Sequence, residues 1–221
     1  MKTKSRLFAG YLLLTVCLSG GLGLTSAWAG AEIFLYPVAR AFGSPSESEL
    51  ARCRVAFKQL QAGLEKSRVV VMPVLFADAG RGQWRSDLAA VEMRELATRT
   101  SAKIEVSLVE PKVAAPPRFH NQLRYLWKRS TVYRDWIKAA HPSGDYVLVT
   151  EIFGGGGKVG AIQIYLFDSS GQVAYSRLLN SHQFGPNLPL AGEGAVKLIV
   201  NTFFDNLKWD AKKLFSPYGV G

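Results

Sequence analysis

Hydrophobic positions recur at helical spacing in some segments of the chain and alternate or run together in others. Runs typical of strands cover residues 33–36, 68–76, 103–109, 145–153, 159–167 and 172–179. Apolar residues three or four apart predict helices over residues 44–64, 87–99, 119–139 and 194–207. Ser44, Pro45 and Glu47 would begin the first helix as N-cap, first helical residue and capping-box partner. Pro73 is a defect in the second run, because proline cannot donate to a sheet.

The elements follow in the order β-α-β-α-β-α-β-β-β-α, with a loop predicted over residues 77–85. Strands separated by helices favour parallel crossovers, whereas the last three strands are joined by short turns at residues 154–158 and 168–171. The sequence therefore predicts an α/β (α+β) fold. Its mixed sheet has parallel crossovers first and an antiparallel β-meander last, with helices packed on it.

The first 29 residues have the three parts of a secretory signal peptide: a basic start, an apolar stretch over residues 7–24, and Ala27-Trp28-Ala29. We expect cleavage after Ala29 and export of a single globular domain, residues 30–221, to the periplasm or cell envelope. A retained membrane anchor and lipidation at Cys17 are the alternatives. Glycines dilute the apolar stretch, and Val16 precedes Cys17 where lipoprotein processing needs a small residue.

The formal charge of the chain is +10, and the signal peptide contributes +3, so the mature protein carries 10 − 3 = +7. Such an excess favours an anionic partner: an envelope protein, an anionic envelope polymer, or lipid head groups at a peripheral membrane contact. Nucleic acid is not expected in that compartment, and solubility alone would also explain the charge. Cys53 is the only cysteine left after cleavage, and its place on an apolar helical stripe predicts a buried, unpaired thiol.

No catalytic residue, metal ligand or cofactor site is predicted. The glycines before Lys158 lack P-loop spacing, and a strand follows them where a P-loop needs a helix. The three histidines have no metal spacing, and Ser181-His182 lacks a nucleophile turn. Glu151 lies inside an apolar strand and would need a partner if it pointed inward. Asp168 is explained by its turn.

The helix over residues 119–139 has the strongest candidate binding surface. Its main apolar stripe includes Ser130, Tyr133 and Ile137, and a second apolar stripe lies about 100 degrees around the helix. Basic residues dominate the narrow polar face. The candidate binding residues are Arg124, Lys128, Lys138, Tyr125 and Trp136. The alternative is that the second stripe packs into its own domain and leaves the lysines solvated.

Three segments resemble a known group of proteins: RVVVMPVLF from Arg68, DYVLVTEIF from Asp145, and the hairpin LFDSSGQV from Leu166. Over residues 68–207 the chain resembles the small α/β domain of bacterial envelope proteins. That group includes the TolB amino-terminal domain, the curli-secretion lipoprotein and the lipoprotein activators of penicillin-binding proteins. The resemblance implies a non-enzymatic role in the envelope.

Together these observations favour an exported envelope accessory protein that binds or assembles an envelope protein or polymer. An envelope hydrolase with an unrecognised site and a small-ligand carrier are the alternatives. The oligomeric state, and the identity of the partner, are not predicted by any pattern in the chain.

Overall fold

A computed structural model describes residues 45–78, 81–113, 122–155, 157–180 and 192–215, and of Asp78 and residues 122–127 it describes the backbone alone. All of them belong to one compact unit, Gly43–Gly221. The predicted signal peptide and the predicted strand over residues 33–36 lie outside the described residues.

The first described helix, α3, spans Glu47–Gly63 and is followed by a short 3-10 turn, η2, over Leu64–Lys66. Its N-cap is Ser46, which forms a complete capping box with Glu49, so the predicted cap at Ser44 is two residues too early. The predicted stripe is confirmed, because Cys53, Phe57 and Leu60 are fully buried.

Seven strands form one mixed sheet with β5 at its centre. β1 and β2 both pair with one edge of β5 in parallel, and β4 extends the sheet beyond β1 in parallel. On the other edge β6 pairs antiparallel with β5, and β7 antiparallel with β6. This confirms the predicted fold class. The strands are β1 Arg68–Val71, β2 Val74–Asp78, β3 Arg81–Arg85, β4 Lys103–Val106, β5 Tyr146–Gly155, β6 Lys158–Asp168 and β7 Val173–Asn180.

The apolar run over residues 68–76 is divided where Pro73 falls. β1 pairs with the start of β5, at Tyr146–Leu148, and β2 pairs with its end, from Glu151 onward. The division follows from the missing amide hydrogen of proline, which leaves a gap in the ladder. The two short strands therefore act as one interrupted neighbour of β5.

The predicted loop over residues 77–85 is wrong, because β2 turns back into β3 and pairs with it antiparallel. The first three residues of β3 are exposed and the last two half-buried. An edge strand with so little buried surface has no hydrophobic alternation, so its backbone pairing could not be predicted from the pattern.

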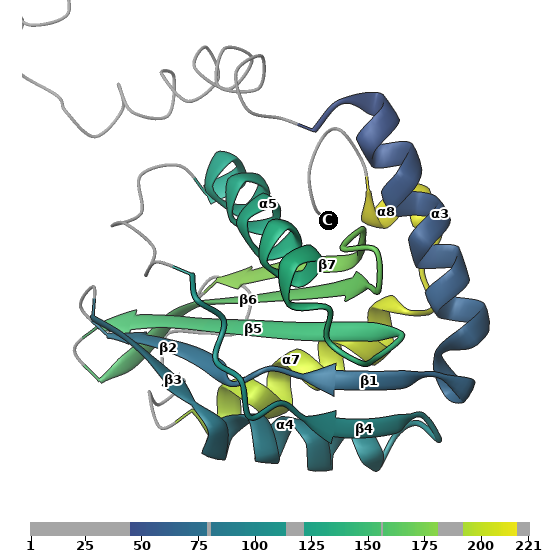
Figure 1. The fold of residues 1–221 in the computed structure, drawn as a ribbon. Helices are drawn as coiled ribbons and strands as arrows, with labels where there is room; N and C mark the ends of the chain where they lie inside the picture. Colours follow the sequence, from purple (N-terminus) through teal and green to yellow (C-terminus); the bar gives the residue numbers. More distant parts are fainter. Residues whose placement is uncertain (1–44, 79–80, 114–121, 156, 181–191, 216–221) are drawn as a thin grey trace, which may run out of the picture. The chain divides into compact units, whose positions relative to one another are not determined.

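Two helices cover one face of the sheet and one covers the other (Figure 1). α4, Ser86–Ala97, and α7, Glu193–Asn206, pack against each other on the first face. α5, Gln122–Ala140, crosses the opposite face, and α3 lies along β7. A short helix that was not predicted, α8, spans Ala211–Leu214 and contacts α3.

Candidate functional site

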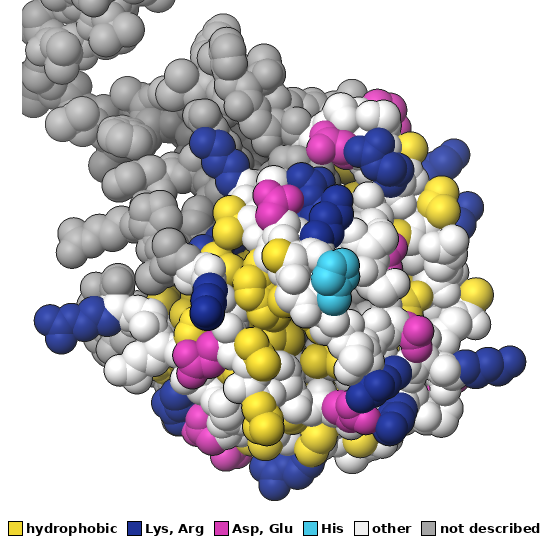
Figure 2. Space-filling view, in the orientation of Figure 1, with side chains coloured by type: hydrophobic (Ala, Val, Ile, Leu, Met, Phe, Trp, Pro, Cys, Tyr) yellow, Lys and Arg dark blue, Asp and Glu magenta, His cyan; other side chains and the backbone are white. Residues whose placement is uncertain are grey.

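The outer surface of α5 presents the predicted cations to solvent. Lys128 and Lys138 are exposed, and Val132 is 45% exposed. Trp136 is half-buried and packs against the core. The side chains of Arg124 and Tyr125 lie outside the described residues. Figure 2 shows one face of the molecule, on which both basic and acidic side chains lie around a group of hydrophobic ones.

The inner surface of α5 is fixed to β5 by a buried polar network. Arg129, which is 6% exposed, donates from Nε to Oε1 of the fully buried Glu151 at 2.7 Å. The Tyr133 hydroxyl donates to the same oxygen at 2.5 Å, and Nη2 of Arg129 donates to that hydroxyl at 3.2 Å. The Tyr133 ring also packs against Tyr165 and Phe167 of β6. The helix therefore has one defined orientation on the sheet.

Burial raises the pKa of the Glu151 carboxyl, while the Arg129 charge and the Tyr133 hydroxyl act in the opposite direction. Burial also raises the pKa of Tyr133 well above its usual value, and the neighbouring Glu151 charge adds to that effect. Tyr133 is therefore a neutral hydrogen-bond donor at neutral pH. An inward Glu151 was expected to need a partner, and that partner is Arg129, which no pattern in the sequence indicated.

A second buried carboxyl, which the sequence analysis did not single out, lies on the opposite face of β5. Glu92 of α4 is fully buried, and its Oε1 accepts a hydrogen bond from the Thr150 hydroxyl at 2.7 Å. Burial raises its pKa to about 7. The spacing of Glu92 in the sequence could have predicted its burial, because it lies four residues from both Leu88 and Leu96 on the buried stripe of its helix.

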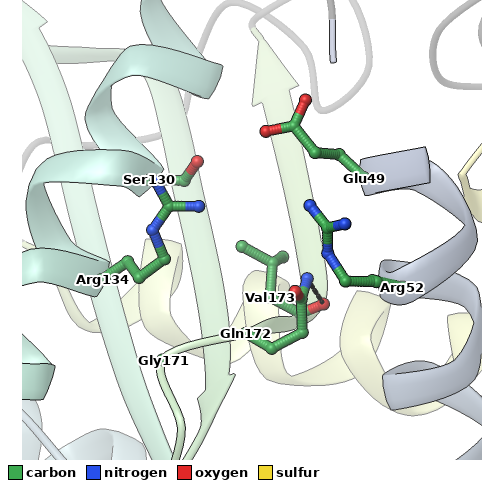
Figure 3. A pocket seen from close by; sticks show the side chains of 7 residues that line it. All are labelled: Glu49, Arg52, Ser130, Arg134, Gly171, Gln172 and Val173. Atoms are coloured by element: carbon green, nitrogen blue, oxygen red, sulfur yellow. Dashed lines mark hydrogen bonds between the residues drawn. The ribbon is translucent and has the colours of Figure 1, made fainter. Parts of the chain in front are cut away.

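A pocket opens where α3, α5 and the β6–β7 turn meet (Figure 3). Its accessible volume is about 10 Å³, room for roughly one water-sized group, and it is open to solvent on one side. Side chains of α3 and α5 face each other across it, and the turn lies beneath them. Its lining residues are Glu49, Arg52, Ser130, Arg134, Gly171, Gln172 and Val173.

The β6–β7 turn reaches the pocket because of its local chemistry. Oδ1 of Asp168 accepts hydrogen bonds from the Ser170 amide, the Ser170 hydroxyl and the Gln172 amide, which confirms its expected role in the turn. Gly171 has φ +79°, and a Cβ there would lie 3.0 Å from Cγ of Arg134. Glycine therefore permits both the left-handed turn and its close approach to α5.

Two guanidinium groups face this pocket with little else to bind. Within the described part of the chain Arg52 makes no hydrogen bond or ion pair, and Nε of Arg134 has only Asp135, at 3.7 Å. Glu49 is the acidic member of the lining. Its Oε2 accepts from the Ser46 amide and hydroxyl at 2.8 Å each, and the amide hydrogen bond is the main cause of its lowered pKa.

The described acidic residues that were weighed as catalytic candidates lie far apart. In the β5–β6 ladder Glu151 is opposite Gln163, whereas Asp168 is opposite Tyr146, five residues further along. That spacing corresponds to roughly 16 Å of strand. Ser181 and His182 lie outside the described residues.

Where the chain is described, no group of three or more His, Cys, Asp or Glu side chains is placed to hold a metal ion. Nor does any helix of those ranges have the length and apolar character of a membrane span.

No protein-family model and no curated protein sequence matches the chain. Among solved structures it is similar to the LpoB C-terminal domain from Salmonella enterica, at 15% identity and a TM-score of 0.34, over 58% of this chain and 93% of that one. It is also similar to a variant of PelC from Paraburkholderia phytofirmans, solved as a dodecamer, at 13% identity and a TM-score of 0.31. That match covers 64% of this chain and 89% of the PelC chain. Both are weak matches at the level of the fold.

Proposed function

We propose that this chain is an exported envelope accessory protein whose domain binds an anionic envelope protein or polymer through the outer surface of α5. The observation that carries the proposal is the combination of exposed cations and a rigid support. Lys128 and Lys138 are exposed on a helix that Arg129 and Tyr133 hold against Glu151 from below.

A rigid support matters because a surface that is already ordered loses little conformational entropy on binding. The exposed charge attracts an acidic partner and accelerates the encounter. Val132, at 45% exposure, and the accessible part of Trp136 supply apolar contact area on one flank of the helix, beside Lys128 and away from Lys138. The exposed Asp135 lies between the two lysines around the helix. Arg124 and Tyr125, on the first turn of the same helix, belong to the proposal as residues that extend the surface.

The proposal is tested by placing a photo-crosslinking amino acid at Val132 in cells that export the protein. We expect crosslinks to one or a few partners, and none of the same partners from a crosslinker at the exposed Lys66, which belongs to η2 and not to α5. The double variant Lys128→Glu/Lys138→Glu should lose most of these crosslinks at low salt, where charges are least screened.

The matched control is Lys58→Glu/Lys66→Glu, which changes the net charge by the same amount at exposed positions outside α5. It should retain the crosslinks. If both double variants lose them equally, net charge and not the α5 surface governs binding. If neither loses them, the lysines of α5 do not contact the partner, and the proposal is wrong.

A further inference from the structure

We infer that the pocket between α3 and α5 binds the terminal carboxylate of a peptide chain, so that the partner of the α5 surface is a protein held by a free carboxyl end. The inference rests on the proposed function and specifies its ligand. It is carried by Arg52 and Arg134, which come from different helices and face the same small space (Figure 3).

Arginine is the side chain best suited to a carboxylate, because its planar guanidinium offers parallel donors in a fixed geometry. Two such groups around one pocket can donate to both oxygens of a single carboxylate. Arg52 has no internal partner among the described residues, and the Asp135 contact of Arg134 is long, at 3.7 Å. Neither therefore has to break a strong ion pair to receive a ligand.

The charge of the lining favours a monoanion. Arg52 and Arg134 contribute +2 and Glu49 contributes −1, because its lowered pKa keeps it ionised, which leaves 2 − 1 = +1. One carboxylate neutralises that charge. A phosphate dianion would exceed it and would be repelled by Glu49 at short range.

Acceptors beside the two arginines favour a peptide over a simple organic acid. Nε2 of Gln172 already donates to Sγ of Cys53 and, at 3.5 Å, to the carbonyl of Val173, so its amide oxygen remains to accept. Oε1 of Glu49 is likewise outside the capping box, which uses Oε2. The last residue of a peptide carries an amide N–H next to its carboxylate, and these acceptors suit that group.

The experiment titrates the mature protein with N-acetyl-triglycine, with the same peptide as its C-terminal amide, and with inorganic phosphate. Backbone amide signals of Gly171–Val173 are followed by NMR. We expect saturable shifts with the free acid and binding of the amide that is weaker by roughly tenfold or more, since a lost charge-assisted hydrogen bond is worth about that factor. Phosphate should also bind more weakly than the acid, because its charge exceeds that of the lining and is repelled by Glu49.

Arg52→Gln and Arg134→Gln should each weaken binding of the free acid by roughly tenfold, while Lys58→Gln on the same helix should leave it unchanged. Spectra of the unliganded variants check that the fold is kept. Equal binding of acid and amide, no binding at all, or unchanged affinity in both arginine variants overturns the inference. Phosphate binding as tight as that of the acid also overturns it, because the site would then be a general anion site.

Failure here is distinguishable from failure of the proposed function. Crosslinking from Val132 that depends on Lys128 and Lys138 would uphold the α5 surface even if the peptide did not bind. Conversely, peptide binding that depends on Arg52 and Arg134, without such crosslinks, would leave a carboxylate site on a protein that uses another surface.

Discussion

Replacing Glu92 with glutamine should change how the stability of the protein depends on pH. Glu92 is fully buried, and Oε1 accepts from the Thr150 hydroxyl while Oε2 has no partner. Burial raises its pKa from 4.5 to about 7. The folded state therefore retains a proton that the unfolded chain releases.

The sign follows from that difference in bound protons. The stabilising effect of the protonated carboxyl is complete below about pH 4.5, falls as the pH rises, and is lost above about pH 7. A pKa difference of 7 − 4.5 = 2.5 corresponds to about 3 kcal/mol of unfolding free energy between these limits. Glutamine keeps an oxygen that accepts from Thr150 but has no charge, so Glu92→Gln should remove this slope.

Urea unfolding of the mature protein between pH 4 and pH 9 measures the effect. Relative to wild type, Glu92→Gln should gain about 3 kcal/mol on going from acid to alkaline pH. Glu95→Gln, three positions further on in the same helix and half-buried, is the control and should follow the wild-type curve. Parallel curves for wild type and Glu92→Gln would refute the reasoning, since Glu92 would then titrate alike in both states.

Five further outcomes are expected. Cys53→Ala should cost about 1 kcal/mol for a small cavity, and the native thiol should resist polar reagents, because burial raises its pKa to about 12. Arg129→Met should cost roughly 3–5 kcal/mol in urea unfolding, because it leaves Glu151 buried without its cation; a cost below 1 kcal/mol would contradict the network. Arg177→Met should be neutral or stabilising in the same assay, because Nε and Nη1 of this buried guanidinium have no hydrogen-bond partner among the described residues, and the Trp209 ring lies 5.2 Å from its charge. Mass spectrometry of exported material should find Gly30 at the amino terminus, and a lipid on Cys17 would contradict that prediction.

Most of the sheet and its helices could be predicted because burial imposes a period on the sequence. The stripe of α3 and the meander of β5, β6 and β7 have strong apolar patterns, and the structure confirms them. The strand β3 could not be predicted, because it is a mostly exposed edge strand that pairs through its backbone. Such pairing does not require the alternating apolar residues by which a strand is recognised in a sequence. Pro73 was recognised as a defect, but only the pairing with β5 shows that it divides the strand.

The candidate site was predictable only in part, and for a different reason. Exposed lysines on α5 follow from the helical period, and so does the burial of Tyr133. The pocket does not, because Arg52 and Arg134 are 134 − 52 = 82 residues apart and meet only when α3 and α5 flank the β6–β7 turn. A sequence pattern reports how a residue relates to its own element, and it does not report which elements become neighbours.

The two buried carboxyls connect the fold to the proposed function. Thr150 and Glu151 are consecutive on β5 and point to opposite faces, where Thr150 binds Glu92 of α4 and Glu151 binds Arg129 of α5. Apolar contacts alone would tolerate sliding or rotation of a helix, whereas a hydrogen bond to a buried charge is satisfied in one orientation only. Such groups add little to stability, since removing them from water is costly. We therefore attribute their presence to orientation. Through Glu151, the central strand determines which face of α5 is turned outward, with Lys128 and Lys138 exposed on it.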